Sequence, residues 1–146
     1  MYTLMYLSVA THPMQPYELS SILEQSRLSN KRKAITGCLA YIEGLLRAEE
    51  PHCIFVQVLE GQEDAVTAVF DKIKIDSRHT DVKLVRQGYI EKRNFESWEM
   101  GFEEIRLPAD SSLQGFFSLN PDILAMDGTI NDNMLLNFMK SFYKAL

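Results

Sequence analysis

Four polar residues lie where the surrounding pattern predicts apolar ones. Gln57 interrupts the apolar run FVQVL, and Tyr6 lies on one face of the apolar stretch near the N terminus. Ser26 and Asn30 occupy the next positions of an apolar stripe with helical spacing. A phenol can lose an electron and a proton, and a primary amide both donates and accepts hydrogen bonds. These residue types predict a site for a polar ligand beneath an apolar roof.

Each residue also has a purely structural interpretation. A buried Gln57 could be satisfied by backbone or water, since an unsatisfied amide costs about 1–3 kcal/mol. Tyr6 could be a half-buried tyrosine with a satisfied hydroxyl. Ser26 and Asn30 could mark the end of a helix that frays into solvent. From the residues alone both interpretations stay open.

The elements that would position these residues follow from hydrophobic periodicity. The first hundred residues alternate between strand-like and helix-like stretches. We expect strands at 2–9, 35–42, 53–59, 82–90 and 95–102, and helices at 16–29 and 63–73. Pro16 suits the first position of a helix, and Gly44 is expected to end the strand that begins at residue 35.

The predicted order, βαββαββ, indicates an α+β fold with a ferredoxin-like mixed sheet and both helices on one face. We expect the first and third strands to form a central parallel pair, with Tyr6 and Gln57 facing the same space. In the last strand, alternation places Trp98, Met100 and Phe102 on one face.

A second region follows the predicted domain of residues 1–105. Residues 106–146 are expected to form a C-terminal helical cap, with a possible helix at 111–119 and an amphipathic helix at 135–146. The latter is expected to cover the sheet face that the first two helices leave bare.

Composition narrows the class of protein. The net charge of −5 argues against a general nucleic-acid binder, and no apolar run approaches the roughly 18 residues that span a membrane. Cys38 and Cys53 form neither a metal motif nor a disulfide framework, so a reducing cytoplasm is expected. The three histidines lack metal-ligand spacing, and no phosphate-binding loop occurs.

Five segments, in order, make the sequence similar to the BLUF domain, a blue-light sensor that uses flavin. They are the first strand with Tyr6, NKRKAITG at 30–37, FVQVLEG at 55–61, DSRH at 76–79 and RNFESWEM at 93–100. The resemblance covers residues 2–102 and assigns residues 1–105 to a flavin-binding photosensor domain.

The resemblance implies that FAD is held noncovalently between the two helices, with FMN or riboflavin as substitutes in some members. Tyr6 then matches the tyrosine that gives an electron and a proton to the excited flavin. Gln57 matches the glutamine between that tyrosine and the flavin. Asn30 matches the asparagine that hydrogen-bonds the pyrimidine edge of the ring.

Other matched positions complete the implied site. Asp76, Arg78 and His79 correspond to the residues beside the ribityl chain and the phosphate, and Lys72 to a basic residue near the phosphate. Ser26 is also expected to contact the flavin, because it occupies a polar position on the helical stripe that faces the site. Trp98 and Met100 match a pair that relays the signal.

The implied activity is sensory rather than enzymatic. Rotation or tautomerisation of the Gln57 amide would reverse the hydrogen bonds that it offers to the flavin and slightly red-shift the absorption. The signal is thus stored in a bistable amide and read by an unidentified downstream protein. We also expect a homo-oligomer.

Two departures from the family pattern stand out. Ser29 occupies a position where asparagine or histidine is common, which puts one flavin contact in doubt. The segment GLLRAEEPH at 44–52 is longer than the usual tight hairpin and is expected to be an exposed loop. It is either a tolerated insertion or a contact with a partner or a second copy.

Two other functions compete with photoreception. The first is a BLUF-like module that has lost flavin or photoactivity and only oligomerises. The second is a small ferredoxin-like enzyme such as an acylphosphatase. The loop THPMQP at 11–16 disfavours that enzyme, because it lacks the arginine and glycine of a phosphate cradle.

Overall fold

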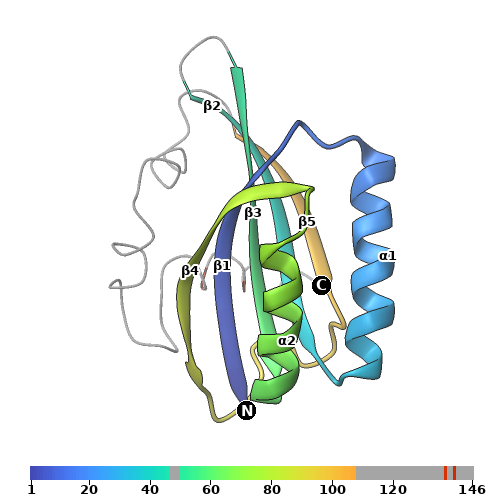
Figure 1. Cartoon of the computed structure of the whole chain (residues 1–146), viewed down its shortest axis with the longest axis vertical. Helices are drawn as coiled ribbons and strands as arrows, with labels where there is room; N and C mark the ends of the chain where they lie inside the picture. Colours follow the sequence, from blue (N-terminus) through green and yellow to red (C-terminus); the bar gives the residue numbers. More distant parts are fainter. Residues whose placement is uncertain (47–49, 108–136, 138–139, 141–146) are drawn as a thin grey trace.

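The computed structural model describes residues 1–46, 50–107, 137 and 140. Its elements are β1 (Tyr2–Ala10), α1 (Pro16–Arg32), β2 (Thr36–Leu46), β3 (Glu50–Gly61), α2 (Glu63–Lys74), β4 (His79–Tyr89) and β5 (Gly101–Leu107). They form one sheet of order β4-β1-β3-β2-β5, with both helices over the same face (Figure 1). The expected α+β, ferredoxin-like fold is confirmed. Most of the expected C-terminal helices at 111–119 and 135–146 lies outside the described residues. The domain boundary between 105 and 106 stays a prediction.

The expectation of a parallel central pair is wrong. β1 and β3 are antiparallel, and Tyr6 lies directly opposite Gln57. The crossover through α1 makes β2 parallel to β1, and the hairpin then reverses the chain, so β3 enters between them antiparallel to both. Only β5, which pairs with β2, runs parallel to its neighbour. Tyr6 and Gln57 nevertheless face the same space, as predicted.

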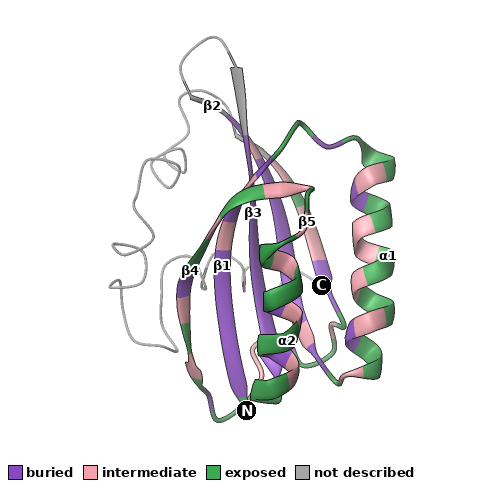
Figure 2. Ribbon diagram, in the orientation of Figure 1, coloured by how far each residue is buried: buried purple, intermediate pink, exposed green. Residues whose placement is uncertain are grey.

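The central strands of the sheet are buried on both faces, which we call the helix face and the far face; the edge strand β4 is mostly exposed or half-buried. Alternate residues of β3 divide between them: Phe55 and Gln57 share the helix face with α1 and α2, whereas Val56 and Val58 belong to the far face. All four are buried, and so is most of β1 (Figure 2). Burial on both faces explains why these strands are nearly continuous apolar runs.

Helix α1 is longer than its apolar stripe predicts. It begins at Pro16 with a reciprocal capping box between Gln15 and Glu18 and continues to Arg32. Asn30 therefore lies in the last helical turn and is 2% exposed, so this end of the helix does not fray into solvent. Among the described residues, no helix is long and apolar enough to cross a membrane.

The expected hairpin loop at 44–52 is largely strand. Gly44 does not end β2, because the pairing with β3 continues through Leu46 opposite Glu50. The extra residues thus lengthen both arms of the hairpin. A glycine inside a strand weakens it but does not stop it when the partner strand continues the hydrogen-bond ladder.

The expected strand at 95–102 is also wrong over most of its length. Only from Gly101 does the chain pair with β2, and the residues before it form turns. Met100 packs on the helix face, whereas Trp98 packs on the far face and stacks on Phe95 with ring centroids 6.1 Å apart. A Cβ on Gly101 would lie 1.6 Å from Trp98 Cε3, so the missing side chain of Gly101 makes room for the indole.

The close approach of β2 and β3 at Gly37 yields a first prediction. A Cβ at this position would lie 1.9 Å from the backbone oxygen of Val58, so Gly37→Ala must push the two strands apart. We expect this substitution to lower the free energy of unfolding, measured with urea, by about 3 kcal/mol or more. Gly61→Ala is the matched control, because its nearest neighbour is the flexible Ile35 side chain at 3.2 Å. Equal losses in the two variants would contradict this account.

Candidate functional site

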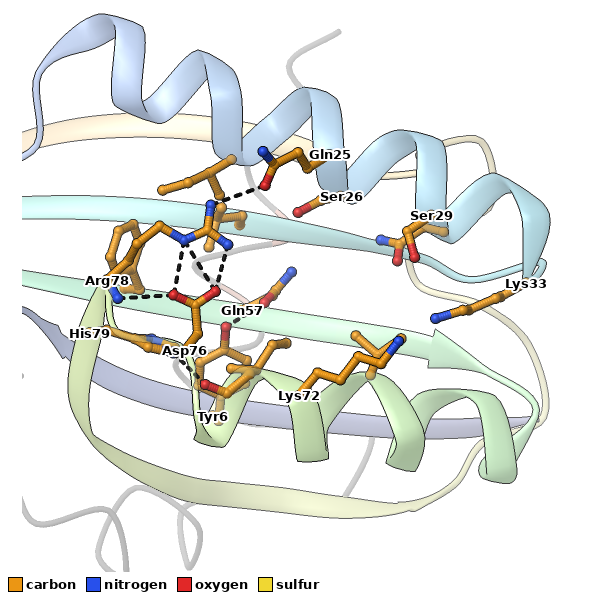
Figure 3. Close-up of a pocket in the computed structure, with 16 residues that line it drawn as sticks. Tyr6, Gln25, Ser26, Ser29, Lys33, Gln57, Lys72, Asp76, Arg78 and His79 are labelled. Atoms are coloured by element: carbon orange, nitrogen blue, oxygen red, sulfur yellow. Dashed lines mark hydrogen bonds and ion pairs between the residues drawn. The ribbon is translucent and has the colours of Figure 1, made fainter.

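A cavity of about 320 Å³ opens between α1 and α2 above the helix face of the sheet (Figure 3). Ile22 of α1 and Val69 of α2 supply apolar walls, and Leu39 and Phe55 lie on the floor. Its polar lining residues are Tyr6, Gln25, Ser26, Ser29, Asn30, Lys33, Gln57, Lys72, Asp76, Arg78 and His79. The volume falls in the range of small-molecule sites, roughly 300–1,000 Å³.

Tyr6 and Gln57 form a hydrogen-bonded pair on the cavity floor. Tyr6 Oη donates to Gln57 Oε1, and Gln57 Nε2 lies 3.4 Å from Met100 Sδ. The two side chains are 3% and 5% exposed. The amide is therefore satisfied by side chains that line or border the cavity. Burial raises the pKa of Tyr6, with a smaller contribution from Asp76, so the phenol keeps its proton at neutral pH.

His79 fixes the other side of the Tyr6 ring. Its Nε2 lies 2.6 Å from the backbone oxygen of Ile73, and its Nδ1 lies 2.7 Å from Ser8 Oγ. Because a carbonyl oxygen only accepts, Nε2 carries the hydrogen. The imidazole stands edge-on to Tyr6 at a centroid distance of 6.2 Å, so the tyrosine ring is held by packing as well as by its hydroxyl.

Asp76 and Arg78 form an ion pair at one end of the cavity. The Arg78 guanidinium donates to both carboxylate oxygens of Asp76 at 2.5–3.1 Å, and its Nη1 reaches Gln25 Oε1 on α1 at 3.3 Å. Hydrogen bonds from Arg78 lower the pKa of Asp76, and those to Asp76 raise the pKa of Arg78. The pair thus links the segment after α2 to α1 across the cavity (Figure 3).

The opposite end of the cavity carries two lysines. The amino groups of Lys33, just after α1, and Lys72 on α2 reach toward each other on the side away from Arg78 (Figure 3). Sequence reasoning missed Lys33, together with Gln25, and left Ser29 in doubt. The helical spacing from Ile22 through Gln25 and Ser29 to Lys33 is a signal that could have found them.

The residues predicted from sequence gather around this cavity, with one exception. Eight of them line it: Tyr6, Ser26, Asn30, Gln57, Lys72, Asp76, Arg78 and His79. Met100 touches the site through Gln57. Trp98 does not reach the cavity, because it packs on the far face of the sheet.

Helix α1 also holds the segment that carries Met100. Asn30 Nδ2 donates to the backbone oxygen of Glu99 at 3.0 Å, and Arg27 Nε donates to that of Met100 at 3.0 Å. Asn30 therefore belongs both to the cavity lining and to the support of Met100.

The cavity suits a planar, partly polar molecule. Apolar side chains from the two helices face each other across it, and the polar groups lie on the floor and at both ends. A flat heteroaromatic ring would place its faces against the aliphatic side chains and its edge near Asn30 and Gln57. The cations Lys33, Lys72 and Arg78 suit an anionic extension of such a ring.

Comparisons with known proteins agree with this geometry. A family model described as BLUF, sensors of blue-light using FAD, matches residues 1–101. The photoactivated adenylate cyclase subunit beta of Euglena longa is 41% identical over 93 residues, which cover 64% of this chain and 10% of that protein. The corresponding subunit of Euglena gracilis is 39% identical over 95 residues, 65% of this chain and 10% of that protein. The chain thus spans about a tenth of the length of these relatives.

Solved structures share the fold. BlrB, a BLUF protein in its dark state, superposes with a TM-score of 0.69 at 23% identity, covering 99% of this chain and 96% of that one. BlrP1 of Klebsiella pneumoniae, solved with FMN and cyclic diGMP, gives a TM-score of 0.61 at 26% identity, covering 96% of this chain and 34% of that one. The family match, the relatives and the fold lead to one conclusion: the chain belongs to the BLUF family of flavin-binding blue-light sensors.

Proposed function

We propose that this blue-light sensor holds FAD in the cavity between α1 and α2 and uses Tyr6 and Gln57 as its switch. The observation that carries the proposal is the buried cross-strand pair itself. The oxidisable phenol of Tyr6 donates its hydroxyl hydrogen to the Gln57 amide, which can turn. Both groups lie on the floor of a cavity that fits a planar ring.

The lining residues divide the work of holding the cofactor. Ile22, Val69 and Ile73 would contact the ring faces, and Asn30 and Gln57 its polar edge. Ser26 adds a hydroxyl from α1. Lys72, at the lysine end of the cavity, would contact the phosphates. Asp76, Arg78 and His79, at the other end, would hydrogen-bond the opposite end of the flavin, with Asp76 fixing the Arg78 guanidinium.

A bound flavin would supply absorption of blue light and an excited state that accepts an electron. Tyr6 is suited to lose that electron, because burial keeps it a neutral phenol. An oxidised phenol is strongly acidic, and its Oη proton already points at Gln57 Oε1. The Tyr6 proton therefore has an acceptor in place before any atom moves.

The two orientations of the Gln57 amide differ in hydrogen bonding. As observed, Oε1 accepts from Tyr6 and Nε2 faces Met100 Sδ. After rotation Nε2 would face Tyr6 Oη, and Oε1 would face a sulfur that has no hydrogen to donate. The rotated amide thus loses a weak hydrogen bond inside the protein, which favours a return to the observed orientation in the dark.

The output of the sensor is proposed to be a protein contact rather than catalysis by this chain. The described residues form the sheet, the two helices and the cavity between them, and the match to the cyclase relatives is confined to about a tenth of their length. The chain after β5, which ends at Leu107, is proposed to cap the far face, and Trp98 packs on that face. We further propose a homo-oligomer in a reducing cytoplasm, where the buried Cys38 and Cys53 stay reduced and form no disulfide with each other.

Substitution of the switch residues tests this function. Tyr6→Phe removes the oxidisable hydroxyl and Gln57→Leu removes the amide, while both keep the size of the side chain. We expect both variants to purify with flavin and to lose the reversible red shift that blue light produces in the wild-type absorption spectrum. Tyr17→Phe, at a tyrosine that is 73% exposed, is the matched control and should keep the shift.

The same spectra decide between the alternatives. A normal light-induced shift in Tyr6→Phe would contradict the proposed switch. A wild-type protein that binds flavin without any shift would be a binder that no longer signals, and one that takes up no flavin even from added FAD would be an interaction module.

The identity of the cofactor is tested at the lysine end of the cavity. If Lys72 contacts a phosphate, Lys72→Gln should weaken FAD and FMN about tenfold, equivalent to about 1.4 kcal/mol, and leave riboflavin unchanged. Binding is measured by quenching of flavin fluorescence on titration of the apoprotein. Lys74→Gln is the control, since Lys74 pairs with Asp71 at 2.8 Å and does not line the cavity. Equal weakening of all three flavins would show that Lys72 acts on the ring pocket instead.

A further inference from the structure

A buried carboxylate on the far face has no part in the function described so far. Glu60, near the end of β3, is 0% exposed. Its oxygens accept from Asn94 Nδ2 at 2.7 Å, from the backbone nitrogen of Asn94 at 2.8 and 3.0 Å, and from that of Phe95 at 3.1 Å. Every one of these partners is a donor, so the site is built for a group that only accepts.

The neighbouring arginine fastens the same turn to the sheet. Arg93 Nη1 donates to Thr36 Oγ1 and to the backbone oxygen of Glu60, and Nη2 donates to the backbone oxygen of Ala34, each at 2.7 Å. The turn at 93–95 is thus tied to the start of β2 and the end of β3. These charge-assisted contacts are stronger than neutral hydrogen bonds.

This turn begins the segment that reaches Gln57. From Phe95 on the far face the chain passes Trp98, whose backbone oxygen accepts from Gly37 N at 2.9 Å, and arrives at Met100 on the helix face. Met100 Sδ then lies 3.4 Å from Gln57 Nε2. Four residues, 96–99, separate the clamped turn from Met100. Glu60 and Arg93 hold the start of this short segment, while Gly37, Asn30 and Arg27 hold its end.

We propose that Glu60 is a positioning residue for the Gln57 switch: its buried carboxylate fixes the turn at 93–95 and thereby sets Met100 against the Gln57 amide. This inference rests on the proposed function of Tyr6 and Gln57. Glu60 itself touches neither the cavity nor the amide, so it acts only through the segment at 93–100.

Glu60→Gln is the main test. The variant keeps the shape of the side chain but turns an NH₂ group toward backbone N–H donors, which loosens the turn. We expect flavin binding and a light-induced shift, with dark recovery slowed at least about fivefold, because return of Gln57 toward Met100 loses part of its driving force. Glu24→Gln, at an exposed position of α1 outside the cavity, is the control and should recover like the wild type.

A second readout does not depend on photochemistry. Trp98 is the only tryptophan of the chain and stacks on Phe95, next to the clamp. In flavin-free protein, Glu60→Gln should red-shift the Trp98 emission relative to wild type and to Glu24→Gln. Asn94→Ala removes only the side-chain donor and should change both readouts in the same direction by less. If Glu60→Gln does not fold, the dark recovery and Trp98 emission of Asn94→Ala test the role of Glu60 in its place.

The outcomes separate this inference from the function on which it rests. A wild-type protein without a light-induced shift would refute the proposed switch and with it the role of Glu60. A shift in wild type together with unchanged or faster recovery in Glu60→Gln would refute the role of Glu60 alone. Red-shifted emission with unchanged recovery would also refute it, because Glu60 would then hold the turn without positioning Met100.

Discussion

The hydrogen bond from Tyr6 Oη to Gln57 Oε1 joins two neighbouring strands at the centre of the sheet. Both side chains are buried. An amide inside a sheet needs partners at both of its ends, since an unsatisfied end costs about 1–3 kcal/mol. Tyr6 satisfies the oxygen, and Met100 is the weaker partner of the nitrogen. Because its nitrogen has only a weak partner, the Gln57 amide loses little free energy when it turns. An amide with strong hydrogen bonds at both ends would lose more.

Because the central strands are buried on both faces, the Tyr6–Gln57 pair is connected by packing to both layers of the domain. The helix face holds the cavity, and the far face holds an apolar layer that includes Phe95 and Trp98. The segment at 93–100 contacts both layers: its turn hydrogen-bonds the Glu60 carboxylate on the far face, and Met100 lies against the Gln57 amide on the helix face. A change at Gln57 therefore bears directly on a segment that also packs on the opposite side of the sheet.

Charge is distributed around the cavity in keeping with these roles. The floor carries neutral polar groups, whereas the cations lie at the two ends, with Arg78 held by Asp76 and Lys33 and Lys72 reaching in from opposite sides (Figure 3). The phenol stays neutral because burial raises the pKa of Tyr6, and the nearby Asp76 carboxylate adds to that rise. The ion pair at one end also contacts α1, because Arg78 donates a hydrogen bond to Gln25 at 3.3 Å.

The sequence by itself determined the order of the elements, the two amphipathic helices and the facing of Tyr6 and Gln57. Periodicity is a local property, and a period of two fixes which side chains share a face. The ordered motifs located six residues that line the cavity, the family resemblance added Lys72, and the helical stripe added Ser26. Strand direction, the continuation of β2 beyond Gly44 and the separation of Trp98 from Met100 depended on tertiary structure. Each involves a distant partner. β3 inserts between β1 and β2, and Glu50 extends the ladder opposite Leu46. Glu60 accepts hydrogen bonds from Asn94 and Phe95, in the irregular stretch before Gly101. Local alternation cannot reveal such contacts, because they join residues that are far apart in the chain.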